Sequence, residues 1–232
     1  MHIHNLHPWD VSPAEAVQIQ KQVARQIRIV PLQNDIHHVA GADVSYNIGS
    51  DDFYAAVVVF TFPDLQRVEE AVATAHAPFP YIPGLLSFRE APVLLQAFQR
   101  LTTEPDVILF DGHGIAHPRQ IGIASHVGVF LDRPSIGCAK KKLTGVYDAP
   151  ALGQHAGETV PLQTKDGSPL GAVVRTKTRT KPLFISPGHK IDLAASVQIV
   201  LTCCHGYKLP EPTRLAHHCV NRVRREHTQN PP

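Results

Sequence analysis

The sequence predicts an α/β fold in which a mixed sheet carries helices on both faces. Three segments separated by short gaps, at 39–45, 53–62 and 66–76, indicate antiparallel strands. The segment 105–111 is a short apolar run that ends in an aspartate, which indicates a strand buried on both faces. Segments with helical periodicity are interspersed with these strands, as expected where helices cover a sheet.

The first predicted element is a helix over 12–28. Ser12 can cap this helix, Pro13 suits its first turn, and Glu15 stands three residues after Ser12, as in a capping box. Three prolines exclude regular structure from 78–84, because each removes a backbone donor. The later predicted elements are helices at 87–101, 121–131, 192–204 and 212–225, and strands at 105–111, 134–139, 171–176 and 182–186.

The order of these elements is informative. An antiparallel meander that leads into β-α-β-α-β is typical of the ribonuclease-H-like layout, a mixed sheet with helices on its faces. Residues 148–169 are rich in Gly, Pro and polar residues, which indicates an excursion or a hairpin insertion. We expect one domain over 1–232, with 226–232 as a disordered tail.

Composition and charge indicate the cellular compartment of the protein better than they indicate its function. The formal net charge of +2 is too small to indicate a nucleic-acid partner by itself. The four cysteines fit neither a C-x-x-C zinc pair nor a secreted disulfide framework, which favours a reducing compartment. The N-terminus lacks the pattern of a signal peptide, and no apolar run approaches the roughly 20 residues of a membrane span. We therefore expect a cytoplasmic protein, and a monomer by default.

Three acidic residues stand where apolar residues are expected. Asp43 lies within the first strand, and Asp111 ends the apolar strand at 105–111, where open α/β sheets collect their ligands. Glu90 heads the apolar face of the helix at 87–101, and burial of a lone carboxylate is costly. Taken singly, each also fits an ordinary position: an edge strand, a strand end, or a helix first turn.

Together the three carboxylates indicate a metal site. Clustered hard oxygen ligands suit Mg²⁺ or Mn²⁺ rather than zinc. Metals held in this way are a standard device for phosphoryl transfer, because they generate hydroxide and neutralise the developing charge. We therefore expect Asp43, Glu90 and Asp111 to form a magnesium site suited to phosphoryl transfer.

Several segments, in this order, resemble the signature blocks of the endonuclease V family. They are AGADVSY, PYIPGLLSFRE, DGHGIAHPRQIGIASH, IGCAKKKLTG, FISPGH and LPEPTRLAH, and they span about 40 to 217. The resemblance implies a ribonuclease-H-like, Mg²⁺-dependent endonuclease in which Mn²⁺ can substitute. It further implies recognition of deoxyinosine and cleavage of the backbone one linkage beyond it on the 3′ side, leaving 3′-hydroxyl and 5′-phosphate ends.

The resemblance also implies roles for individual residues. Asp43, Glu90 and Asp111 are the metal-binding acids, Lys140 contacts the scissile region, and His217 bonds the attacking water or phosphate. The strand-separating wedge comprises Pro80, Tyr81, Ile82 and Pro83. The lesion pocket comprises Gly84, Leu86, Gly112, Gly114, His117, Gly122 and Ile123, whose glycines let backbone approach the base closely.

Other readings remain open from the sequence. The substrate could be inosine-containing RNA rather than DNA, and the fold could serve as a nucleic-acid-binding module without catalysis. His113 and His117 lie four residues apart and, with Asp111, match a catalytic zinc set, so a zinc hydrolase is a third reading.

Overall fold

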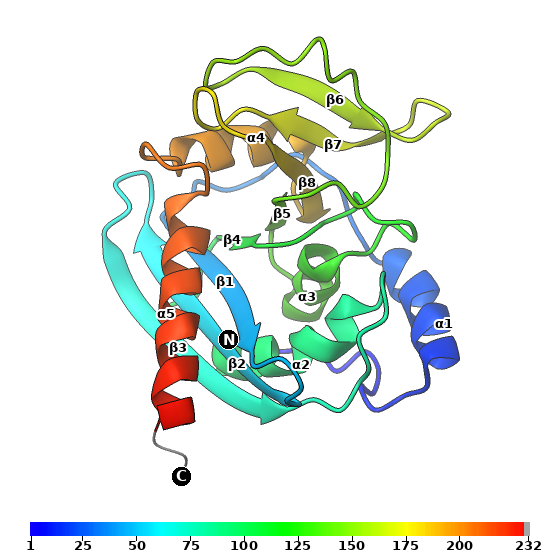
Figure 1. Ribbon diagram of the computed structural model, residues 1–232, viewed down its shortest axis with the longest axis vertical. Helices are drawn as coiled ribbons and strands as arrows, with labels where there is room; N and C mark the ends of the chain where they lie inside the picture. Colours follow the sequence, from blue (N-terminus) through cyan, green and yellow to red (C-terminus); the bar gives the residue numbers. More distant parts are fainter. Residues whose placement is uncertain (230–232) are drawn as a thin grey trace.

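The computed structural model describes residues 1–229 and confirms an α/β fold built on one eight-stranded mixed sheet (Figure 1). The sheet order is β3-β2-β1-β4-β5-β8-β7-β6. The strands are β1 (His38–Tyr46), β2 (Asp52–Thr61), β3 (Arg67–His76), β4 (Val107–Phe110), β5 (Ser135–Ala139), β6 (Thr159–Gln163), β7 (Pro169–Val174) and β8 (Leu183–His189). The helices are α1 (Pro13–Ala24), α2 (Leu86–Gln99), α3 (Ile123–Leu131), α4 (Leu193–Thr202) and α5 (Glu211–Gln229).

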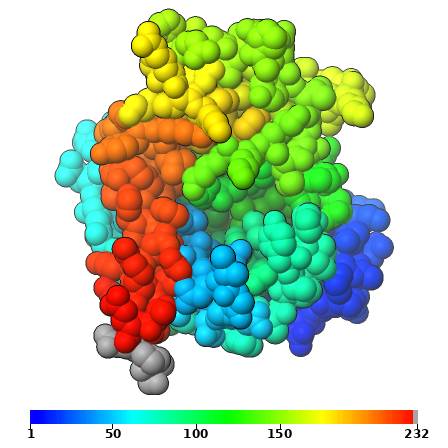
Figure 2. Space-filling model, viewed as in Figure 1, coloured from blue at the N-terminus to red at the C-terminus, as the bar shows by residue number. Residues whose placement is uncertain are grey.

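The pairing of the strands confirms the predicted ribonuclease-H-like layout. β1, β2 and β3 form an antiparallel meander. β4 then pairs parallel with β1, and β5 pairs parallel with β4, with α2 and α3 as the crossovers. β8 returns antiparallel to β5, and the β6–β7 hairpin extends that edge to form one end of the molecule (Figure 2).

Each face of the sheet is covered by its own pair of helices. Along β4, Ile108 and Phe110 face the core formed with α2 and α3, whereas Val107 and Leu109 face the core formed with α4 and α5. This alternation is the period of two that a strand imposes on its side chains. Because both faces are buried, β4 is apolar throughout, as the sequence predicted.

Three sequence expectations are refined by the structure. The capping box of Ser12 and Glu15 is confirmed, but α1 ends at Ala24 rather than at 28. The backbone N–H of Lys190 donates to the Arg28 carbonyl at 2.6 Å, so the chain leaves the helix to lie beside the end of β8. Residues 148–169 contain β6 and the start of β7, which confirms the hairpin alternative.

The expected disorder of the tail is wrong for residues 226–229. They continue α5, where the Asn47 side chain donates to the Thr228 hydroxyl at 3.1 Å and ties this end of the helix to the turn after β1. Residues 230–232 lie outside the described part of the chain. None of the helices within 1–229 has the length and apolar character that a membrane crossing requires.

One glycine controls how closely α5 approaches the sheet. A Cβ added at Gly41 would overlap the backbone carbonyl of Pro212 in the first turn of α5. The helix therefore rests on bare backbone of β1, two residues before Asp43. The position of α5 relative to the end of β1 depends on this contact.

We predict that Gly41→Ala lowers the free energy of unfolding by roughly 1–3 kcal/mol, the usual cost of overpacking a tight contact. The added methyl group must push α5 away from β1. Urea denaturation of the variant and the unaltered protein measures the difference. Equal midpoints and equal slopes would show that the contact is looser than the structure describes.

Candidate active site

The carboxylates of Asp43 and Asp111 are neighbours because two parallel strands are in register. Ala42 of β1 pairs with Phe110 of β4, so the next residue on each strand is an aspartate at the same edge of the sheet. This edge is where the carboxyl ends of parallel strands meet, and where ligands of open α/β sheets bind. The side chains are only 11% and 15% exposed for Asp43 and Asp111, respectively.

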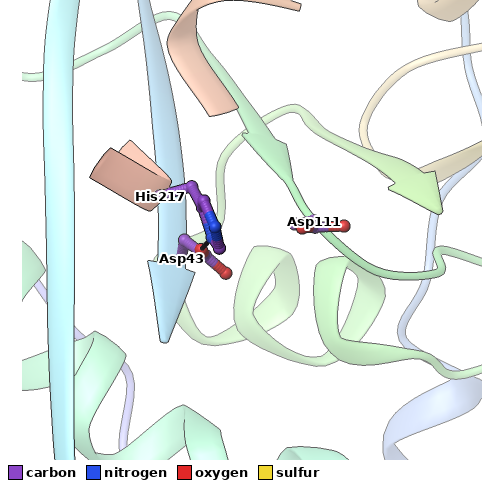
Figure 3. A group of neighbouring side chains, drawn as sticks. All are labelled: Asp43, Asp111 and His217. Atoms are coloured by element: carbon purple, nitrogen blue, oxygen red, sulfur yellow. Dashed lines mark hydrogen bonds and ion pairs between the residues drawn. The ribbon is translucent and has the colours of Figure 1, made fainter. Parts of the chain in front are cut away.

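His217 completes a compact group with these two acids. It projects from α5, and its Nδ1 lies 2.7 Å from Oδ2 of Asp43 (Figure 3). One ligand atom from each of Asp43, Asp111 and His217 can be chosen so that all three atoms lie within 4.8 Å of one another. The Asp43 hydrogen bond raises the pKa of His217. The amide of Asn221 donates to the backbone carbonyl of His217 at 2.8 Å, one turn further along α5.

Glu90 adds a third carboxylate to the same electrostatic environment. It lies on α2, and burial, followed by the negative charges of Asp43 and Asp111, raises its pKa to about 8. Burial also raises the pKa of Asp111. Within residues 1–229, Glu90 is not one of the three tightly grouped ligands. The raised pKa favours the protonated, neutral form of Glu90 at neutral pH, and a cation bound nearby would favour its ionised form.

Lys140 provides the nearest positive charge. It follows β5, the strand beside β4, and its Nζ forms an ion pair with Oδ2 of Asp111. The Lys140 side chain is 41% exposed, so its ammonium is open to solvent on one side. Lys141 and Lys142 are exposed next to it. The sequence expectation that Lys140 belongs beside the acids agrees with this geometry.

Next to the acids is a cavity of about 170 Å³ that is lined mainly by apolar atoms. Gly112, which directly follows Asp111, forms part of its wall. Among the expected wedge and pocket residues, the lining includes Tyr81, Ile82, Pro83, Gly84, Leu86, Gly112, His117, Gly122 and Ile123. The acids and the cavity therefore share a border at a single peptide unit.

Two expected residues lie outside this lining in the described chain. Pro80 borders a different hollow, formed with Trp9 and Phe79. Gly114 packs against β8 instead: its N–H donates to the Ser186 hydroxyl at 2.9 Å, and a Cβ there would overlap the Pro187 carbonyl. Close packing of backbone thus accounts for glycine at 114 without reference to a ligand.

Sequence reasoning missed several residues that line the cavity. They are Gln20, Ser87, His113, Ile121 and Leu143. Ser87 belongs to a chain of hydrogen bonds. His126 is hydrogen-bonded to the Ser87 hydroxyl through Nδ1 at 2.8 Å and to Nε2 of His7 through its own Nε2 at 2.8 Å. The N-terminal segment therefore contributes to the frame of the cavity. No local sequence signal connects His7 with a residue 80 positions away.

The donor set fits a hard divalent cation. The carboxylates of Asp43 and Asp111 present oxygen atoms at one point, with one imidazole beside them. The alternative zinc set is not assembled: the part of the chain that the structure describes groups Asp111 with Asp43 and His217, and not with His113 and His117.

Adjacent carboxylates at the ends of parallel strands, in a sheet of this order, define a ribonuclease-H-like nuclease class. The endonuclease V family model matches residues 19–218. The chain belongs to the endonuclease V family, and is accordingly a nuclease of the hydrolase class. Endonuclease V of Gloeobacter violaceus is 46% identical over 222 residues, which cover 95% of this chain and 89% of the relative.

Solved structures give the same result. Endonuclease V of Streptomyces avermitilis superimposes with a TM-score of 0.89 at 36% identity, covering 95% of this chain and 96% of the other. Endonuclease V of Ciona intestinalis, in complex with a 24mer DNA that contains an inosine followed by a ribo-adenosine, has a TM-score of 0.78 at 26% identity. That alignment covers 92% of this chain and 98% of the other.

We predict that acid weakens the fold through His117. Burial, followed by the charge of Arg119, lowers the pKa of His117 from 6.5 to about 4. Between these values the unfolded chain binds a proton that the folded chain excludes, so the free energy of unfolding decreases as the pH falls from 6.5 to about 4. Denaturant unfolding at several pH values measures this slope.

The matched variants separate His117 from other titrating groups. His117→Gln should reduce the slope in this pH range without abolishing it, because burial also lowers the pKa of His113 to about 4. His155→Gln, at an exposed position outside the cavity, should leave the slope unchanged. Identical slopes for both variants and the unaltered protein would contradict the assignment.

Proposed function

We propose that the protein recognises deaminated purines in DNA and hydrolyses the phosphodiester one linkage beyond the lesion on the 3′ side, with Mg²⁺ as its cofactor. The observation that carries the proposal is the shared border of the acid group and the cavity at Gly112. A base held in the cavity would bring the backbone on its 3′ side to Asp43 and Asp111. The inosine-containing DNA bound by the Ciona relative supports the same substrate class.

The chain's own residues divide the chemistry between them. Asp43 and Asp111, with Glu90 nearby, would hold Mg²⁺, which when bound supplies an activated water and neutralises charge on the phosphate. His217 donates from Nδ1 to the Asp43 carboxylate and so orients it. Lys140 offers its ammonium to a phosphate oxygen. Water oxygen bonds to phosphorus as the P–O3′ bond breaks, leaving a 3′-hydroxyl and a 5′-phosphate.

Positive charge beyond Lys140 supports contact with a nucleic-acid backbone. Burial, followed by the charges of Lys140 and Lys181, lowers the pKa of Lys208. These three lysines, from separate loops, therefore influence one another next to Asp111. Phosphate groups would relieve their mutual repulsion, and binding should weaken as salt increases.

The cavity and the wedge suit a base that leaves the helical stack. Enzymes that read a single base commonly take it out of the duplex into a pocket. Tyr81 is 63% exposed at the cavity rim, between prolines that limit the freedom of its loop. Its ring would occupy the space that the base leaves, as apolar wedges do in other DNA complexes.

Inosine-containing RNA is a second candidate substrate. The ribo-adenosine that follows the inosine in the Ciona complex favours it, because that DNA carries a ribonucleotide directly beside the lesion. Matched DNA, RNA and single-ribonucleotide oligonucleotides, cut under the same conditions with the nick mapped, distinguish the two substrates. Cleavage of none of them with Mg²⁺ would leave only a binding module and overturn the proposal.

We predict that Asp111→Asn lowers the rate of Mg²⁺-supported nicking at least ~100-fold, while binding of inosine-containing DNA persists. The amide keeps the shape of the side chain but removes a negative ligand, and metal-assisted hydrolysis depends on that charge. Gel-based nicking rates and fluorescence anisotropy measure the two properties. Asp64→Asn, at an exposed position, is the control and should cut normally. Normal cutting by Asp111→Asn would refute the assignment.

We predict that Tyr81→Ala slows cleavage of duplex DNA more than cleavage of a single strand of the same sequence. Only in a duplex does the displaced base leave a gap in the stack that the Tyr81 ring would fill. Because the single strand serves as the internal control, a general loss of folding would reduce both rates alike. An equal reduction on both substrates would contradict the wedge role.

A further inference from the structure

The backbone carbonyl of Gly84, at the junction of the wedge and the cavity wall, accepts three side-chain hydrogen bonds. Gln20 Nε2 donates at 3.0 Å, an Arg119 terminal amine donates at 2.6 Å, and His117 Nε2 lies at 3.1 Å. A carbonyl has two lone pairs, so this oxygen is saturated by the protein itself. Three separate parts of the chain converge on one atom.

The three donors also hold one another. Arg119 donates from Nε to Oε1 of Gln20 at 2.6 Å. The backbone N–H of Arg119 donates to Nδ1 of His117 at 3.1 Å, which leaves the imidazole proton on Nε2, facing Gly84. Gln20 is only 1% exposed although it lies on α1, a helix whose polar residues are otherwise on the surface.

Gly84 itself has little freedom to vary. Its φ of +82° is in the left-handed region that favours glycine, and a Cβ would lie 2.8 Å from Arg119. On the other side of the same peptide, the Leu85 N–H donates to the Ile82 carbonyl at 2.9 Å. Hydrogen bonds therefore hold both the C=O and the N–H group of the Gly84–Leu85 peptide. They thereby fix the angle between the wedge and the cavity wall, which continues at Leu86.

We propose that Gln20 and Arg119 are positioning residues for base selection, which hold the Gly84 turn so that the wedge and the cavity form one rigid unit. This inference rests on the proposed function and extends it to α1, which contributes no acid to the site. Neither residue belongs to the group of Asp43, Asp111 and His217. Their loss should loosen the fit of the base without changing the hydrolytic groups.

This division of roles predicts a particular kinetic signature. Gln20→Ala should raise KM for an inosine-containing oligonucleotide roughly three- to tenfold, the usual range for one lost neutral hydrogen bond. Arg119→Ala should raise KM by at least as much, because its charged guanidinium donates to both Gly84 and Gln20. Both variants should lower the preference for inosine over adenosine by a similar factor, with kcat changed less. Because both residues act through one carbonyl, the double variant should lose less than the product of the two single effects.

Matched controls of the same residue types lie on α1 and at its end. Gln18→Ala and Arg25→Ala, both at exposed positions of α1 and its end, should leave KM and base preference unchanged. Arg119→Lys keeps a positively charged donor for Gly84 but loses the planar fork that reaches Gly84 and Gln20 together, so it should restore part of the preference. If Gln20→Ala fails to fold, the comparison of Arg119→Lys with Arg119→Ala carries the test.

The outcomes separate this inference from the proposed function. If the unaltered protein does not cut inosine-containing oligonucleotides at all, the proposed function fails. If it cuts them, but the Gln20 and Arg119 variants lower kcat alone, or show the same preference for inosine as the unaltered protein, the positioning role is overturned. Raised KM with reduced preference supports it.

Discussion

The parallel pairing of β1 with β4 is the constraint on which the rest of the site depends. Register places Asp43 and Asp111 at the same height on neighbouring strands, so two carboxylates meet at one edge of the sheet. Repulsion between such charges opposes the fold unless a cation or a proton intervenes. Two apolar faces, packed under α2 and α3 and under α4 and α5, supply the stability that holds them together.

The backbone also positions the other groups that lie beside the two acids. Gly41 lets α5 rest directly on β1, which brings His217 to Asp43. β5 lies beside β4, and Lys140 directly follows it. Gly112 turns the chain from Asp111 into the wall of the cavity. The proposed sites for backbone cleavage and for base recognition therefore both lie at the end of β4.

The sequence predicted those features that leave a local mark. A carboxylate at the end of an apolar strand is conspicuous, and so are three prolines around Tyr81. The structure brings the two acids together at the edge of the sheet and puts Tyr81, Ile82 and Pro83 in the cavity lining, whereas Pro80 borders a different hollow. Gln20 leaves no such mark, because a glutamine on an amphipathic helix reads as a surface residue. Its side chain is buried against Arg119, which donates a hydrogen bond to Gln20 Oε1 from 99 positions away in the sequence.

Errors at the ends of helices have the same origin. Local propensity extends the first helix to 28, but the backbone carbonyl of Arg28 accepts a hydrogen bond from the N–H of Lys190 instead. Local composition predicts disorder after 226, but Asn47 holds Thr228. In each case a partner distant in sequence decided the outcome, and no window of neighbouring residues contains that partner.

The most direct test of this account is anomalous diffraction from crystals of the protein grown with Mn²⁺ in place of Mg²⁺. The account predicts an anomalous peak between the carboxylates of Asp43 and Asp111, and its loss in crystals of the Asp43→Asn, Asp111→Asn double variant. A peak elsewhere, or none at this edge of the sheet at millimolar Mn²⁺, would contradict it.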